Sequence, residues 1–207
     1  MMSQARQLPV LLFFCLATAF VCGPVAAFEV AAPKVTPGAT AIGAPALYTQ
    51  AMQSIDGDEG EYPEKVLKGV ASLAKLAEQG YAPAQFMLGY YFHTGPNSYD
   101  CLVQAPEKAY YWYGKAAEQN HLKAQYELAM LFNPETGFAR FANREKYLFW
   151  MNKAASLGYS DAQAQLGHMY EKGDAVQADP AIARQWYEKA ARQGNKLAAS
   201  RLKKMPG

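Results

Sequence analysis

The side chains in this sequence that could support catalysis or bind a metal are few and widely spaced. The three histidines are His93, His121 and His168, and no His-Glu-x-x-His or Cys-x-x-Cys spacing accompanies them. The sequence also has no Gly-x-Ser-x-Gly motif and no phosphate-binding glycine loop. A Ser–His pair assembled from distant segments is the one alternative that stays open. We therefore expect no catalytic residue, no metal and no cofactor. The pattern of secondary structure says more about this protein than its reactive side chains do.

One pattern of residues occurs three times. Each copy opens with Ala-Gln, has leucine four residues after the alanine and an aromatic residue eight after it, which is the spacing of one helix face. The opening alanines are Ala84, Ala124 and Ala162, at intervals of 40 and then 38 residues. A second segment of the type Trp-Tyr-x-Lys-Ala-Ala follows in each copy, starting at Trp112, Trp150 and Trp186. A fixed period with fixed internal spacing predicts an array of helical repeats.

These residues resemble the signature of the Sel-one-like repeats, relatives of the tetratricopeptide repeat. The third copy follows that signature almost throughout, and the first differs by a longer turn and by Ala105 at the position of the capping aspartate. The second copy departs most, with Ala129 for glycine, Asn143 for aspartate and Met151 for tyrosine. The resemblance implies an all-α fold, a right-handed superhelical solenoid of helix-turn-helix repeats. A repeat scaffold serves many binding tasks, so it says little about function.

Packing alone explains the signature residues. Gly89 and Gly167 would let two helices approach closely, because glycine has no Cβ. Each tryptophan that starts a second segment is expected to bury a large area, so that Trp→Ala would cost about 3–5 kcal/mol. None of these residues is expected to belong to a binding site.

The face of each first helix that packing does not need is the candidate partner surface. It lies two, six and nine residues after the opening alanine, and in related arrays it lines the concave side of the superhelix. The candidates are Phe86, Tyr90, His93, Tyr126, Met130, Asn133, Ala164, His168 and Glu171. Aromatic residues and methionine at helical spacing suit a protein or peptide partner. For Phe86 and Tyr126, packing under neighbouring elements is an equally good interpretation.

The N-terminus predicts export. Arg6 precedes an apolar run from Val10 to Cys22, and Val25-Ala26-Ala27 follows, which is the order of a cleavable signal peptide over residues 1–27. A retained anchor is the alternative, but the run is short for a membrane span. We expect a periplasmic or secreted protein without stable membrane insertion. After cleavage, Cys101 would be the one cysteine that remains. It would then be a free thiol or take part in a contact with a partner.

The remaining segments complete the predicted organisation. Residues 28–60 read as a proline-containing linker, in which Tyr48, Met52 and Ile55 could form a short capping helix. The solenoid covers 61–207. Its repeats and half repeats are predicted at about 81–120, 121–158, 159–194, 61–80 and 195–205. The formal net charge of +2 is too small for a large nucleic-acid surface.

Three functions compete. The preferred one is a non-catalytic periplasmic adaptor or regulator that binds a protein partner through the concave face. The second is an immunity protein that neutralises a type VI secretion lipase effector, so the partner would be an envelope protein or a secreted toxin. The third, a cell-wall or β-lactam hydrolase, has been proposed for relatives with paired cysteines in each repeat, and this sequence lacks those pairs.

Overall fold

The computed structural model describes residues 43–56, 64–94, 104–135 and 139–205. Within these ranges every regular element is helical. The helices are α3 (Ala44–Asp56), α4 (Glu64–Glu78), α5 (Ala82–Thr94), α6 (Pro106–Glu118), α7 (Leu122–Phe132), α8 (Arg144–Ser156), α9 (Ser160–Lys172), α10 (Pro180–Arg192) and α11 (Lys196–Leu202), with a 3-10 turn at Ala139–Phe141. The expected signal peptide over residues 1–27 and the turn around Cys101 lie outside the described residues.

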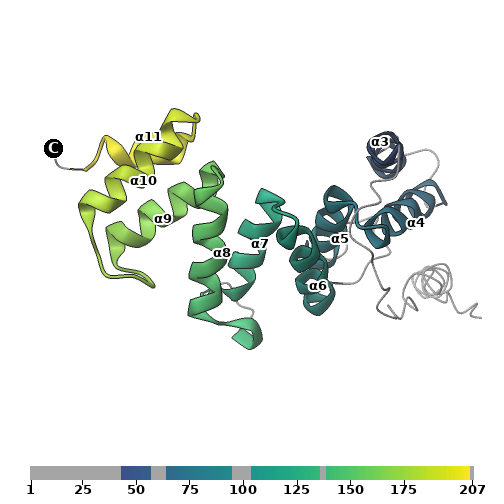
Figure 1. Ribbon diagram of the computed structural model, residues 1–207, viewed down its shortest axis with the longest axis horizontal. Coiled ribbons are helices and arrows are strands. Elements are labelled where there is room, and N and C mark those ends of the chain that lie inside the picture. The colour runs from purple at the N-terminus through teal and green to yellow at the C-terminus, as the bar shows by residue number, and fades with distance from the viewer. Residues whose placement is uncertain (1–42, 57–63, 95–103, 136–138, 206–207) are drawn as a thin grey trace, which may run out of the picture.

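The helices pack as antiparallel pairs that stack into an elongated array. The pairs are α5 with α6, α7 with α8, and α9 with α10, and each pair also contacts the next one along the chain. Figure 1 shows the array extending from α3 and α4 at one end to α10 and α11 at the other. This arrangement is the all-α solenoid of helix-turn-helix repeats that the sequence predicts.

Local residues fix where the helices begin and end. Asp179 caps α10 by accepting hydrogen bonds from the backbone N–H groups of Ala181 and Ile182, and Pro180 follows at the first helical position. Gly173 ends α9 in the left-handed conformation, at φ 81°. Because similar signals recur in each copy, the chain folds into short helices of nearly equal length.

Helix α3 covers the N-terminal end of the array. It spans the three residues that suggested a capping helix and packs against α4. Ile55 is buried, and the ring of Tyr48 lies edge-on to that of Tyr81 with centroids 5.7 Å apart. Residues 44–56 therefore form a short helix at the place where the sequence suggested a capping helix within the segment 28–60.

In each second helix, the residue that directly follows the tryptophan is fully buried. Tyr113, Met151 and Tyr187 are fully buried. Of the tryptophans only Trp112 is buried, whereas Trp150 and Trp186 are half-buried at the edge of the core. The expected cost of about 3–5 kcal/mol thus applies to Trp112 and needs correction to a smaller value for the other two.

The two glycines of the first helices each sit against one of these buried tyrosine rings. A Cβ on Gly89 would lie 2.5 Å from Cδ1 of Tyr113, and one on Gly167 would lie 2.6 Å from Cδ1 of Tyr187. In the middle repeat, Ala129 takes the place of the glycine and Met151 that of the tyrosine. Because methionine is unbranched and flexible, it leaves room for the alanine methyl group. We therefore interpret Ala129 and Met151, two of the departures of this repeat from the signature, as one compensated change.

Buried glutamines connect successive pairs. Each first helix sends a glutamine amide to a backbone carbonyl near the end of the preceding second helix. The bonds run from Nε2 of Gln85, Gln125 and Gln163 to the oxygens of Ala77, Ala117 and Ala155, at 2.9, 3.1 and 3.0 Å. These bonds satisfy buried groups at each junction and fix the spacing of the pairs.

A second glutamine completes this contact in two repeats but not in the middle one. Gln119 donates to Oε1 of Gln85, and Gln193 donates to Oε1 of Gln163, both at 2.7 Å. Leu157 has the corresponding position and nearly the same backbone conformation, and its side chain is 48% exposed. As a result, Oε1 of Gln125 is buried without a hydrogen-bond partner.

We expect Leu157→Gln to stabilise the protein. The new amide can donate to Oε1 of Gln125, and one added hydrogen bond to a buried acceptor contributes about 1 kcal/mol. Little apolar burial is lost, because the leucine is half in solvent. Thermal melts followed by circular dichroism should show a higher Tm, and the reverse change, Gln119→Leu, should lower it. Equal melting of Leu157→Gln and wild type would contradict this account of the junction.

Candidate functional site

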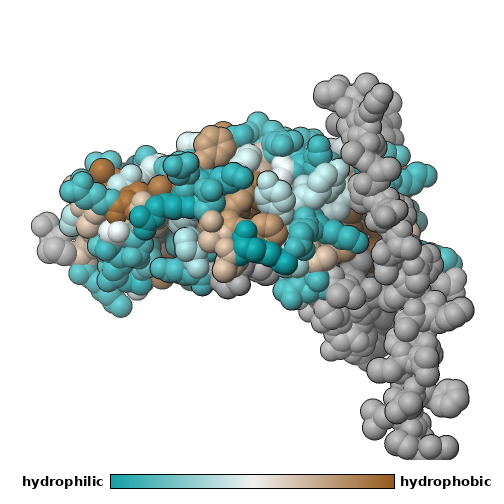
Figure 2. Space-filling model, turned by 90° about the horizontal axis from the view of Figure 1, so that it is seen from below, coloured by the Kyte–Doolittle hydropathy of each residue, from teal (hydrophilic) through white to brown (hydrophobic). Residues whose placement is uncertain are grey.

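Eight of the nine residues predicted from the sequence lie on α5, α7 and α9, the first helices of the three pairs, and Asn133 follows directly after α7. Tyr90 is the most exposed large apolar residue among them, at 40%. Ala164 is buried, because it packs in the cluster that joins α9 to α10 and α11, and only 3% of it is exposed. The other seven are half-buried. Figure 2 shows one long face of the array, where apolar residues in brown lie among polar residues in teal.

Two of the predicted aromatic residues pack partly against their own chain. Phe86 stacks on His121 with centroids 4.8 Å apart and an angle of 22° between the rings, and it also lies against Tyr113. Tyr126 lies against Tyr159, with centroids 5.4 Å apart. Packing therefore uses part of each ring, and a partner could reach only the remainder.

The residues nine positions after the opening alanine contact the buried tyrosine hydroxyls. Nδ1 of His93 lies 3.4 Å from the hydroxyl of Tyr113. The hydroxyl of Tyr187 donates to a carboxylate oxygen of Glu171 at 2.7 Å, and this bond lowers the pKa of Glu171. His93 and Glu171 thus support the core, which the sequence prediction of a partner surface did not include.

Asn133 holds the same position in the middle repeat, where the buried residue is Met151 and no hydroxyl exists. Its Oδ1 instead accepts a hydrogen bond from the backbone N–H of Glu135 at 2.9 Å, just beyond the end of α7. In this repeat, α7 and α8 therefore meet without a bond to a tyrosine hydroxyl. The cause is Met151, the residue that also leaves room for the methyl group of Ala129.

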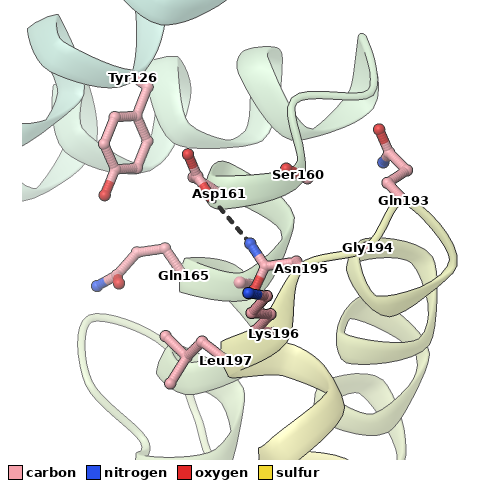
Figure 3. Close-up of a pocket in the computed structure, with 10 residues that line it drawn as sticks. Tyr126, Ser160, Asp161, Gln165, Gln193, Gly194, Asn195, Lys196 and Leu197 are labelled. Atoms are coloured by element: carbon pink, nitrogen blue, oxygen red, sulfur yellow. Dashed lines mark hydrogen bonds between the residues drawn. The ribbon is translucent and has the colours of Figure 1, made fainter.

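An open hollow of about 480 Å³ lies between α7, the start of α9 and the turn into α11. Its lining residues are Tyr126, Ser160, Asp161, Ala164, Gln165, Gln193, Gly194, Asn195, Lys196 and Leu197. In Figure 3, the side chains of Tyr126, Gln165 and Leu197 surround the space, and Asn195 donates to Asp161 along one side at 2.9 Å. Leu197 is 59% exposed, so the hollow joins an apolar edge to hydrogen-bonding groups.

A smaller hollow of about 140 Å³ lies beside the first, between the ends of α7, α8 and α9. Its lining includes Asn133, His168 and Tyr147, together with charged residues of the connecting turns. Gln165 lines both hollows, and its amide donates to the hydroxyl of Tyr147 at 3.2 Å. The two hollows follow each other along α9 and share Gln165, and we call them together the α9 groove.

Four of the residues predicted from the sequence line the α9 groove in the structure: Tyr126, Asn133, Ala164 and His168. It missed Gln165, which lies three residues after the opening alanine, and the residues of the α11 turn. The recurring first-helix face could have revealed Gln165, because that position borders the predicted one on a helical projection. The α11 turn had no such signal, since it meets α9 only through tertiary packing.

The sequence prediction also gave no role to His121, and the role of this residue is structural. Its Nδ1 caps α7 by accepting a hydrogen bond from the backbone N–H of Ala124 at 3.2 Å, while Phe86 covers its ring. Burial, helped by the charge of Lys123, lowers the pKa of His121. The folded protein therefore favours the neutral imidazole, which is the form that can accept this bond.

We expect acid to destabilise the protein through His121. Because its folded pKa is below its unfolded value of about 6.5, the unfolded chain takes up the proton first as pH falls. The stabilisation is complete above about pH 6.5 and is lost as pH falls through the folded pKa. His121→Asn keeps a capping oxygen and should reduce the loss of Tm between about pH 7.5 and pH 5. An unchanged pH profile in this variant would contradict the assignment; burial also lowers the pKa of His93, which supplies the residual slope.

Within the described part of the chain, no three His, Cys, Asp or Glu side chains are placed to hold a metal ion. In the same ranges, no helix combines the length and the apolar character that crossing a membrane requires.

The fold defines a helical repeat protein, with a groove that runs along α9. Comparison with protein families gives the family itself. The Sel1 repeat matches residues 82–121, 122–159 and 160–195, so this chain belongs to the Sel1 repeat family. The resemblance inferred from the sequence is confirmed. Sel1 repeat proteins act in protein–protein interaction.

Two curated relatives are fungal proteins. Chitin synthase regulatory factor 3 of Schizosaccharomyces pombe is 38% identical over 126 residues, which cover 61% of this chain and 13% of that protein. The chitin synthase regulator SKT5 of Malassezia restricta is 31% identical over 136 residues, 65% of this chain and 9% of that protein. The chain thus spans only a small part of the length of these relatives.

Two solved structures with the same fold are bacterial proteins. A protective antigen of uropathogenic Escherichia coli that displays an SLR fold has a TM-score of 0.67 and 30% identity, covering 77% of this chain and 32% of that one. A Sel1 repeat protein from Oxalobacter formigenes has a TM-score of 0.58 and 34% identity, covering 67% of this chain and 99% of that one.

Proposed function

We propose that this chain is a non-catalytic, exported adaptor or regulator that binds a protein partner along the concave side of its first helices. The observation that carries the proposal is the α9 groove, in which Gln165 joins two hollows with apolar edges and hydrogen-bonding groups. Such a mixture suits a peptide or a protein surface. The regulator names of the fungal relatives support a binding role over a catalytic one.

The test of this proposal is the double variant Tyr90→Ala with Tyr126→Ala. Truncating aromatic contacts at an interface typically costs about 2 kcal/mol or more, so we expect partner binding to weaken at least about tenfold. Binding would be measured by calorimetry with a partner captured from an envelope extract. Phe149→Ala is the matched control, because Phe149 is 59% exposed on α8, outside the first helices.

Circular dichroism of the double variant separates binding from folding. Tyr126 packs on Tyr159, so a modest drop of Tm is expected, but the helix content should stay the same. A folded double variant that binds as tightly as wild type would place the contact surface elsewhere. Loss of binding in Phe149→Ala would argue for the second helices instead.

Export and the type of partner are tested by two further measurements. The pattern over residues 1–27 supports cleavage after Ala27, so N-terminal sequencing of the exported protein should begin at Phe28. A full-length protein retained in the inner membrane would contradict export. Capture of an envelope protein would support the adaptor role, whereas capture of a secreted lipase would support the immunity alternative.

A further inference from the structure

Glu127 occupies an unusual place in the repeat array. It lies on α7 at the position that corresponds to Gln165 on α9, three residues after the opening alanine. Gln165 has a partner within the protein, because its amide reaches the hydroxyl of Tyr147 on the preceding second helix. The residue that corresponds to Tyr147 on α6 is Ala109, which is fully buried and offers no hydrogen-bonding side chain.

The carboxylate of Glu127 is half-buried and lacks an internal counter-charge. Within the described residues it forms no hydrogen bond and no ion pair, although other carboxylates such as Glu107 and Glu171 do. Lys123 is one turn earlier on α7, yet its side chain is exposed and does not pair with Glu127. Burial raises the pKa of Glu127, and no positive charge offsets this effect.

The surroundings of Glu127 are aromatic. After burial itself, the charge of Glu127 is the largest cause that raises the pKa of Tyr113 and the pKa of Tyr126, the latter to about 12. It also contributes to the raised pKa of Tyr159. Tyr90 is close enough to affect Tyr113 as well, and it is the exposed aromatic residue of α5. An unpaired carboxylate therefore lies among tyrosines at the middle of the array.

The chemical complement of this arrangement is a cationic side chain. An ammonium or guanidinium group can pair with the carboxylate, and its apolar stem and positive charge are both favoured next to tyrosine rings. A neutral or acidic side chain would leave the half-buried carboxylate unpaired, which costs free energy on binding. The charge of Glu127 and the tyrosines around it thus favour peptides with a cationic side chain over peptides with a neutral or acidic one.

We propose that Glu127 receives a lysine or arginine side chain from an extended segment of the protein partner, between Tyr90 of α5 and Tyr126 of α7. The inference rests on the proposed function, because it assumes that the partner lies along the first helices. It adds which kind of side chain the partner must supply to Glu127 on α7. At the corresponding position on α9, Gln165 already bonds to Tyr147 within the protein.

The experiment uses the purified full chain and an array of short unstructured peptides. The peptides are prepared in matched sets that differ only in a central lysine, arginine, methionine or glutamate. Dissociation constants of the best set are then measured by fluorescence anisotropy. Wild type should bind the lysine and arginine members at least about tenfold more tightly than the methionine member. Glu127→Gln, which is nearly isosteric, should lose that preference, and Glu127→Lys should favour the glutamate member.

The controls separate this inference from the function on which it rests. Glu118→Gln removes an exposed carboxylate at the end of α6 and should keep the cationic preference. A preference that survives in Glu127→Gln, or no binding and no preference in wild type, overturns the inference. If Tyr90→Ala with Tyr126→Ala still weakens binding in that case, the proposed function stands. If that double variant binds peptides and partner like wild type, the proposed function fails as well.

Discussion

Gly167→Leu is expected to destabilise the whole array, with a large fall of Tm. Even a Cβ at this position would lie 2.6 Å from Cδ1 and 2.8 Å from Cε1 of Tyr187, a ring that is fully buried and cannot move aside. Overpacking of a core typically costs about 1–3 kcal/mol, and the added leucine branches raise the cost further. Against a total stability of about 5–15 kcal/mol, such a loss removes much of the folding free energy.

The matched control for this prediction is Gly114→Ala in α6. Beyond its two chain neighbours and the adjoining backbone of α6, no described atom lies within 4 Å of the Cβ that this change would add. Replacing a helical glycine by alanine at an unobstructed site is expected to stabilise by up to about 1 kcal/mol. Circular dichroism melts of the two variants should therefore shift in opposite directions. A Gly167→Leu protein that melts like wild type would mean that α9 and α10 do not approach as described.

The fold could be predicted from the sequence because its signals are local and repeated. Alanine, leucine and an aromatic residue recur at helical spacing, and a residue with positive φ recurs at the end of each second helix, at Gly80, Asn120, Gly158 and Gly194. Gly89 and Gly167 marked close helix contacts correctly, since only glycine suits a position that faces a ring at this distance. Three copies in phase gave each of these signals independent support.

The depth of burial could not be predicted in the same way. Trp150 and Met151 are adjacent, so helical geometry turns them by only about 100° relative to each other. Both are apolar, and periodicity alone could not decide which of them enters the core. Tertiary packing decides it: Met151 is fully buried, whereas Trp150 is half-buried at the edge of the core with Lys153 over its ring.

The site was harder to predict than the fold because it forms between repeats. The α9 groove needs Tyr126 from one pair, Gln165 from the next and Leu197 from the C-terminal half repeat. Each residue is ordinary within its own helix. Glu127 shows the same limit, since its lack of an internal partner is visible only when its surroundings are compared with those of Gln165.

The middle repeat offers a test of how its substitutions compensate each other. Met151→Tyr alone should destabilise the protein by about 1–3 kcal/mol, because the new ring would meet the methyl group of Ala129 as the tyrosines of the other repeats would meet a Cβ on their glycines. Ala129→Gly alone should cost about 1 kcal/mol, through lower helix propensity and lost packing.

The double variant Ala129→Gly with Met151→Tyr should recover most of the stability, because it recreates the pairs Gly89–Tyr113 and Gly167–Tyr187. Asn133 stands where His93 and Glu171 meet the hydroxyls of those tyrosines, so a polar side chain is in place for the new hydroxyl. Denaturant unfolding of the four proteins gives the coupling free energy of the two sites. Strictly additive effects would show that the two departures arose independently, whereas a favourable coupling of about 1 kcal/mol or more would show that the alanine is tolerated because the methionine is there.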